Sequence, residues 1–370
     1  MKKLIIIGNG FDKAHDLKTN YNEFIEDLFT NKYFKDPDLY RDIIKSCSPS
    51  IKTFEKILEY MYAYYRSGSN YNAKIPFHYA GGQISDPKFD NRFIELLLIK
   101  IIEYRWCDVE SRYFEELMLY NEHNKHPYSP KMLNDDFENV KKYLSNYLVD
   151  EEKRARKIDS YEYLFKLFAD SPQTLILNFN YTRTIENLYK DVIKSSIMHI
   201  HGEIENPNNP IIFGYAANHD DSRKLLSHNN NEYIKNIKKH LYKRTNNENI
   251  LKDFLGQNDK NYFDYEKIDI LLFGHSCGLS DNLILNEIFN HKSIYSIKTF
   301  YYEKYENYFD VQVNIDRIMN DDTRFTNLIV NFKDSHRMPQ WSDDTVQVQN
   351  FKKYIKDVKK QYPLKPFSLF

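Results

Sequence analysis

Cysteine is scarce in this chain, and its spacing excludes two kinds of protein. The 370 residues include 3 cysteines, Cys47, Cys107 and Cys277, and none of them belongs to a C-x-x-C pair. A zinc ribbon needs paired cysteines, and a disulfide framework needs an even set of them. The sequence therefore predicts neither a structural metal site nor a disulfide-stabilised secreted domain.

Long apolar runs and an excess of charge are also missing. No segment reaches the ~18 apolar residues of a membrane span, and the run at 4–7 is shorter than the ~7–15-residue apolar region of a signal peptide. The formal net charge is −1, so no overall field attracts nucleic acid or a membrane surface. We therefore expect a cytoplasmic protein without a membrane partner or a nucleic-acid partner.

Glycine is rare, and two of the 10 glycines stand in a turn directly after the first apolar run. The run at 4–7 is typical of a parallel strand buried on both faces. It leads into Gly8-Asn9-Gly10-Phe11-Asp12, a turn whose backbone can approach a ligand closely because glycine has no Cβ. Lys13 stands where a full G-x-G-x-x-G fingerprint has its third glycine, so a purely structural tight turn is the alternative. Asp12 is expected to accept hydrogen bonds from ribose hydroxyls or from backbone amides.

Further apolar runs indicate the other strands of a sheet, and several of them lead into helical patterns such as 182–193 and 282–290. This alternation predicts an α/β, Rossmann-like fold, with a mostly parallel sheet and helices on both faces. The predicted strands lie at 174–180, 196–202, 210–214, 268–274, 296–302 and 326–332.

Two segments interrupt this predicted core. Apolar residues recur at helical spacing through most of 36–170, apart from a loop rich in Gly, Asn and Pro at 67–87. A second segment is rich in Asn and Lys. We predict a core of 1–35, 171–216 and 265–335, a large helical insertion at 36–170, a smaller polar insertion at 217–264, and a C-terminal extension at 336–370.

Polar side chains follow two of the predicted strands. Asn178 and Asn180 lie on one side of their strand, where an amide can orient a sugar hydroxyl or a water; capping of the next helix is the alternative. His201 ends the following strand and is a candidate general base. His199 is expected to be a hydrogen-bonded core residue, and the alternative of a metal-binding histidine pair lacks a matching acid or thiol motif.

A third turn, Gly274-His275-Ser276-Cys277-Gly278, follows the run at 268–274 and precedes Asp281. Its small residues predict close approach of a dinucleotide. A serine hydrolase is the alternative, although the G-x-S-x-G pattern is absent. Cys277 is expected to be a small packing residue.

Taken together, these motifs resemble the AbiH family of bacteriophage abortive-infection proteins. The resemblance is carried by segments 6–12, 178–182, 200–202 and 274–276, together with Asp281. That family is similar, more distantly, to sirtuin-like NAD-binding domains, whose members in defence cleave the bond between nicotinamide and ribose.

The resemblance implies a role for each motif. Asn180 and His201 would be catalytic, and NAD, as substrate or ligand, would contact the residues of the three turns. These cofactor-binding residues would be Gly8, Asn9, Gly10, Phe11, Asp12, Tyr181, Gly274, His275, Ser276 and Asp281. The chain departs from the sirtuin-like motifs in having Asp12 in place of a small Ser, Thr182 in place of an Asp, and no zinc-ribbon cysteines.

Two functions follow from the resemblance and remain open at this point. One is an anti-phage NAD glycohydrolase, which would be gated by a phage-derived trigger or by homo-oligomerisation. The other is a sensor that binds NAD or ADP-ribose without cleaving it. Nucleic-acid attack is a third interpretation, but the basic residues around 235–244 are more typical of a solvated charged face.

Overall fold

The structure is a computed structural model that describes residues 1–36, 40, 42–46, 51–67, 88–104, 108–122, 129–256 and 266–361. The chain divides into two compact units. The sheet unit consists of Met1–Lys18, Leu148–Ile212 and Leu241–Phe370, and the helical unit consists of Thr19–Tyr147 and Phe213–His240. Cys47, Cys107 and the predicted loop after Ser67 lie outside the described residues.

The sheet unit is built on a 6-stranded sheet in which all paired strands are parallel, so the predicted α/β fold is confirmed. The strands are β1 (Lys2–Ile7), β4 (Thr174–Asn178), β5 (Ser196–His199), β6 (Ile268–Phe273), β7 (Ile294–Tyr301) and β8 (His336–Arg337).

The order of these strands across the sheet is β5-β4-β1-β6-β7-β8. Counted along the chain within this sheet, that order is 3-2-1-4-5-6, the arrangement of dinucleotide-binding α/β sheets. The strand order reverses between β1 and β6. Such sheets bind ligands outside the carboxyl ends of the strands at this reversal.

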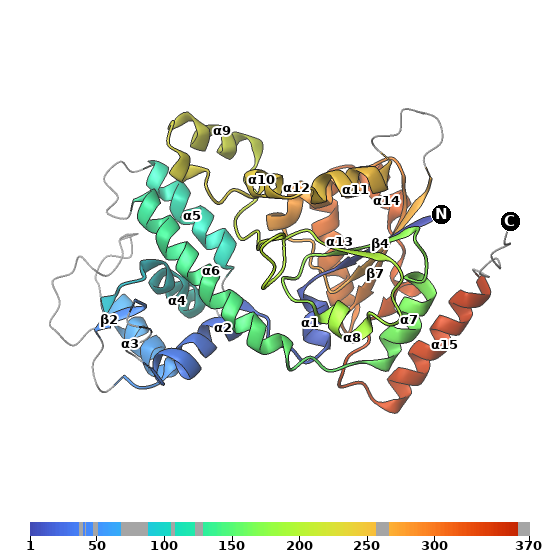
Figure 1. The fold of residues 1–370 in the computed structure, drawn as a ribbon, viewed down its shortest axis with the longest axis horizontal. Coiled ribbons are helices and arrows are strands. Elements are labelled where there is room, and N and C mark those ends of the chain that lie inside the picture. The colour runs from blue at the N-terminus through green and yellow to red at the C-terminus, as the bar shows by residue number, and fades with distance from the viewer. Residues whose placement is uncertain are drawn as a thin grey trace. The chain divides into compact units, whose positions relative to one another are not determined.

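Helices cover both faces of the sheet, as predicted, because the strands are apolar on both sides. Leu4 and Ile6 of β1 pack into a core with α11, α12 and α13, whereas Ile5 and Ile7 pack into a core with α1, α7, α8 and α15. The helix α15 runs beside α7 (Figure 1). The helices of this unit are α1 (Asn9–Ala14), α7 (Asp159–Phe168), α8 (Thr184–Tyr189), α11 (Asn247–Leu255), α12 (Asn282–Phe289), α13 (Tyr305–Met319), α14 (Asp322–Leu328) and α15 (Thr345–Gln361).

Two of the predicted strands are wrong. Residues 210–214 are irregular, and the amide of Ile212 donates to the carbonyl of His201 (2.7 Å). Residues 326–332 contain the end of α14, and Ile329 makes only an isolated bridge to Ile297. The last strand of the sheet is instead β8.

The helical unit is held together by aromatic packing and a buried ion pair. Phe137 of α6 stacks on Phe213 with ring centroids 4.6 Å apart. Glu110 of α5 pairs with Lys238 (3.1 Å) and accepts the Gly214 amide (2.9 Å). The elements are α2 (Tyr21–Asp27), a π-helix (Leu28–Tyr33), β2 (Ile44–Ser46), α3 (Phe54–Ser67), β3 (Lys88–Phe89), α4 (Arg92–Tyr104), α5 (Val109–Glu122), α6 (Pro130–Glu152, whose last turn belongs to the sheet unit), α9 (His219–Ser227) and α10 (Lys238–Leu241). None of the helices described in either unit has both the length and the apolar character needed to cross a membrane.

Candidate functional site

The two glycine turns at the reversal point pack against each other. The amides of Gly8 and Gly10 donate to the carbonyls of Phe273 (3.0 Å) and Gly274 (2.8 Å). A Cβ on Gly8 would stand 2.6 Å from His275 Cα, and a Cβ on Gly10 would stand 2.7 Å from Gly274 Cα. The missing Cβ atoms therefore allow the two loops to approach each other. A phosphate bound through these two amides would have to replace the bonds that they already make.

Asn180 is attached to the first of these turns. Its Nδ2 donates to the carbonyl of Gly8 (3.1 Å), and its backbone amide donates to Oδ1 of Asn178 (2.9 Å). Asn178 thus satisfies the backbone at the end of β4 and does not cap α8, whose N-cap is Arg183. The Nδ2 bond fixes the orientation of the Asn180 amide, so Oδ1 is the atom with which this side chain can accept a hydrogen bond.

Asp12 pairs with Thr182 at the same edge of the sheet. Oγ1 of Thr182 donates to Oδ2 of Asp12 (2.5 Å), and Thr184 donates to Thr182 (3.3 Å). Asp12 is 1% exposed, and its Oδ1 has no hydrogen-bond partner among the described residues. Burial raises the pKa of Asp12 to about 6, although the neighbouring hydroxyls of Thr182 and Thr184 work against this rise.

His199 is the hydrogen-bonded core residue that the sequence predicted. Its Nδ1 lies 3.0 Å from the Asn180 carbonyl and its Nε2 lies 2.7 Å from Oε1 of Glu186. Both partners can only accept, so both ring nitrogens carry protons. Burial lowers the pKa of His199, but the Glu186 carboxylate and the Asn180 carbonyl outweigh that effect and leave the pKa raised.

His201 lies at the same edge of the sheet, just beyond β5. Its Nε2 is 2.9 Å from the hydroxyl of Tyr242 and 3.3 Å from Oδ1 of Asp281. The other carboxylate oxygen, Oδ2, is 3.4 Å from Nε2 of His275. The ring of Phe179 meets both imidazoles edge to face, with centroids 5.0 Å from His201 and 4.3 Å from His275.

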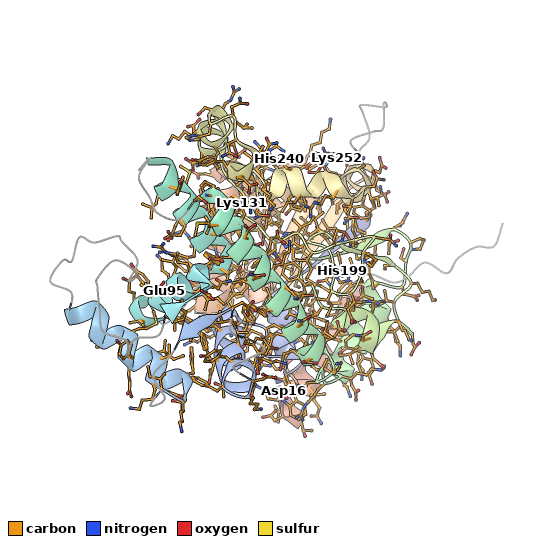
Figure 2. The ribbon with its side chains drawn as sticks, turned by 60° about the vertical axis from the view of Figure 1, so that its left-hand side comes forward. Asp16, Glu95, Lys131, His199, His240 and Lys252 are labelled. Carbon is orange, nitrogen blue, oxygen red and sulfur yellow. The ribbon has the colours of Figure 1, made fainter. Side chains whose placement is uncertain are left out.

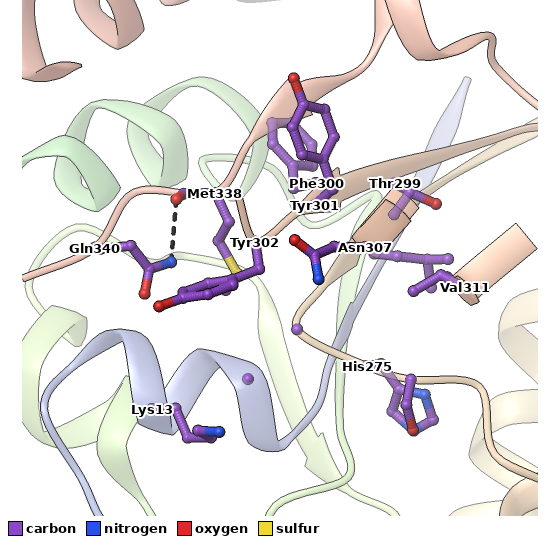
Figure 3. A pocket seen from close by; sticks show the side chains of 14 residues that line it. Lys13, His275, Thr299, Phe300, Tyr301, Tyr302, Asn307, Val311, Met338 and Gln340 are labelled. Carbon is purple, nitrogen blue, oxygen red and sulfur yellow. Dashed lines mark hydrogen bonds between the residues drawn. The ribbon is translucent and has the colours of Figure 1, made fainter. Parts of the chain in front are cut away.

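A pocket of about 370 Å³ opens beside the glycine turns, at the carboxyl ends of β6 and β7 (Figure 3). In Figure 3 the ring of Tyr302 lies beside Met338 and Gln340, and Nε2 of Gln340 donates to the Met338 carbonyl (3.1 Å). The lining residues are Gly10, Lys13, Leu272, Gly274, His275, Ser276, Thr299, Phe300, Tyr301, Tyr302, Asn307, Val311, Met338 and Gln340.

The pocket contains only part of the predicted site. Gly10, Gly274, His275 and Ser276 line it, whereas Asn180 and His201 do not. Asp281 connects the two groups, because its carboxylate lies between the pocket residue His275 and His201.

Three other predicted ligand residues have structural contacts. Phe11 is 1% exposed and packs edge to face on Tyr161 in the core. The hydroxyl of Tyr181 donates to the carbonyl of Ile212 (3.2 Å). Gly8, like Phe11 and Tyr181, does not line the pocket.

The wall formed by 299–302 and 338–340 was missed in the sequence. The one available indication was the aromatic sequence Phe300-Tyr301-Tyr302, which comes where β7 ends. Met338 and Gln340 come after β8, which has only 2 residues, and a strand this short has no sequence pattern by which it could be predicted.

No metal site accompanies these residues. Among the described parts of the chain, no group of three or more His, Cys, Asp or Glu side chains is placed to hold a metal ion. Cys277 is fully buried, and burial raises the pKa of its thiol far above the usual range, as expected for a packing residue.

Comparison with protein families gives a match over most of the chain. The family model described as "Bacteriophage abortive infection AbiH" matches residues 4–303, which include every predicted site residue. Comparison with curated proteins gives no match.

Proposed function

The chain belongs to the AbiH family of bacteriophage abortive-infection proteins, and we propose that it acts in this defence by hydrolysing NAD to nicotinamide and ADP-ribose. One observation carries the proposal. The first glycine turn, Asn180 and His201 all lie at the carboxyl edge of a sheet whose strand order is that of dinucleotide-binding folds.

The pocket supports this proposal through its size and its lining. At about 370 Å³ it is at the lower end of the range for small-ligand sites, roughly 300–1,000 Å³, so it would take one nucleoside-sized half of NAD. Aromatic rings such as Tyr302 can stack on a base, and the amides of Asn307 and Gln340 can bond to its edge. The other half of the dinucleotide would extend past His275 toward His201.

The proposed reaction needs little covalent help from the protein. Nicotinamide leaves as a neutral molecule, and the ribose passes through an oxocarbenium-like state that water attacks, as in other glycosidic cleavages. Oδ1 of Asn180 would accept a hydrogen bond from a ribose hydroxyl or from that water. His201 would accept the proton that the water loses, and would pass it on to solvent. Proton transfer by a correctly positioned side chain typically increases the reaction rate by ~10²–10⁴-fold.

The test is the release of nicotinamide from NAD by the purified protein. We expect His201→Ala to lower the rate by at least ~100-fold, because the general base is lost. His240, an exposed histidine labelled in Figure 2, provides the control, and His240→Ala should retain the wild-type rate. Release at equal rates by the wild type and His201→Ala would remove His201 from the mechanism.

A specific observation favours the alternative function, which is binding of NAD or ADP-ribose without cleavage. His201 is 5% exposed and is not part of the pocket wall. Titration calorimetry with NAD and with ADP-ribose measures binding independently of cleavage. Heat of binding without any nicotinamide release would make the protein a sensor.

Control of the activity belongs to the same proposal. A protein that consumes NAD must be inactive before infection, and the burial of His201 is compatible with a resting state. We propose that a phage-derived trigger or association of copies of the chain opens the site. Nicotinamide release by the protein alone and with phage lysate would be compared, and equal rates would exclude a lysate-borne trigger.

A further inference from the structure

Asp281 lies between two imidazoles and does not act as a helix cap. It immediately precedes α12, where an aspartate often accepts backbone amides, but its side chain makes no capping bond there. Its carboxylate instead lies with Oδ1 3.3 Å from Nε2 of His201 and Oδ2 3.4 Å from Nε2 of His275. The carboxylate is 14% exposed, so it is largely shielded from water.

The tautomer of His275 is fixed by the backbone beside it. The amide of Cys277 donates to Nδ1 of His275 (2.9 Å), so Nδ1 holds a lone pair and Nε2 holds the proton. Cys277 has a φ of 54°, in the left-handed region that non-glycine residues rarely adopt. The protonated nitrogen of His275 is thereby the one that lies 3.4 Å from Oδ2 of Asp281.

The same reasoning applies to His201. A carboxylate can only accept, so its approach to Nε2 is favourable when Nε2 carries the proton. The oxygen of Tyr242, 2.9 Å from the same nitrogen, then acts as a second acceptor for that N–H. With its proton on Nε2, a neutral imidazole has its lone pair on Nδ1, and a general base reacts through that lone pair.

We propose that Asp281 is a positioning residue that holds His201 as the Nε2–H tautomer, while His275 holds the second oxygen of the Asp281 carboxylate. The catalytic consequence rests on the proposed NAD hydrolysis, whereas the tautomer assignment does not. In this arrangement His275 in the pocket wall and His201, the proposed general base, both contact the carboxylate of Asp281. Phe179 packs against both rings and shields the arrangement from water.

Nitrogen NMR of protein labelled with ¹⁵N-histidine tests the tautomer directly. Long-range proton–nitrogen correlations should show His201 as Nε2–H in the wild type and in Tyr242→Phe. In Asp281→Asn the side-chain amide can donate to Nε2, so the Nδ1–H form should become the major one. The proposal is overturned if His201 has the same tautomer in Asp281→Asn as in the wild type.

Asp281→Glu retains a carboxylate and covers the case in which Asp281→Asn fails to fold. It should retain the Nε2–H tautomer, and loss of that tautomer in Asp281→Glu would also overturn the proposal. Leu279→Ala is the control for the local backbone, because Leu279 lies in the same short 3-10 turn and is 53% exposed. It should have the wild-type tautomer and rate.

Kinetics give the second readout. Asp281→Asn should lower kcat for nicotinamide release by about 100-fold or more, with KM within a few-fold of the wild-type value, because the base is misoriented while the pocket is intact. An unchanged kcat would overturn the catalytic part. If the wild type releases no nicotinamide, the proposed function fails, whereas the tautomer experiment still decides the role of Asp281.

Discussion

At the scale of residues, Asp12 and Thr182 form a buried pair of a carboxyl and a hydroxyl. A carboxyl and a hydroxyl face each other at 2.5 Å, with the acid on α1 and the hydroxyl beyond β4. Because the Thr182 hydroxyl donates to the buried Asp12 carboxyl, the two side chains depend on each other.

Exchanging the two side chains should therefore be tolerated better than changing either one. Thr182→Asp alone puts two carboxyls in one buried place, and Asp12→Thr alone brings a shorter side chain that leaves the buried Thr182 hydroxyl without its acceptor. At about pH 5, where the Asp12 carboxyl is mostly neutral, each should therefore lower the free energy of unfolding by ~1–3 kcal/mol. The double variant Asp12→Thr/Thr182→Asp should recover most of this loss. Urea unfolding of the four proteins measures the coupling, and additive losses would show that the pair is not exchangeable.

At the scale of elements, the turns after β1 and β6 pack against each other through their backbones, so the conformation of each one depends on the other. Gly10→Ala would place a methyl group 2.7 Å from Gly274 Cα, where only backbone can yield. We expect a loss of ~1–3 kcal/mol in the free energy of unfolding, as for other overpacked sites. Gly278→Ala is the matched control, because its methyl would meet no atom closer than 3.6 Å. Equal denaturation midpoints for the two variants would contradict tight packing of these turns.

The sequence predicts the elements that are long and apolar and misses those that are short. The runs at 4–7, 174–178 and 268–273 are central strands, and burial on both faces makes them largely apolar. The run at 210–214 is apolar for another reason, since Phe213 packs on Phe137 in the helical unit. The 2 residues of β8 leave no detectable pattern. The same limit applies to the site, because the turns were visible as motifs but the wall behind Gln340 was not.

At the scale of the whole molecule, two buried groups with opposite pKa shifts contribute in opposite directions to the response of stability to acid. Burial raises the pKa of Asp12 from 3.8 to about 6, so between these values the folded state binds a proton that the unfolded state does not. Acidification through this range therefore stabilises the fold through Asp12. Burial lowers the pKa of His15 from 6.5 to about 4, so in that range the unfolded state binds the extra proton and acidification destabilises the fold.

Asp12→Asn should separate the two effects. At pH 7 it removes the cost of a buried carboxylate, which amounts to ~3 kcal/mol for a pKa difference of about two, so the variant should be at least as stable as the wild type. Between pH 6.5 and 4 it should lose stability more steeply, because the opposing effect of Asp12 is absent. Thermal unfolding across this range checks both expectations, and parallel curves for the two proteins would contradict the assignment to Asp12.

The contact between Gly10 and Gly274 also determines where the site can widen. The two turns are hydrogen-bonded and packed backbone to backbone, so a movement of one turn would require the other turn to move as well. A larger ligand would then have to gain room from side chains of the pocket, such as Tyr302 and Gln340, and a turn of the Gln340 amide would break its bond to the Met338 carbonyl. We therefore expect ligand selectivity at this pocket to depend on the side chains of Tyr302 and Gln340, since the glycine turns are held by backbone contacts.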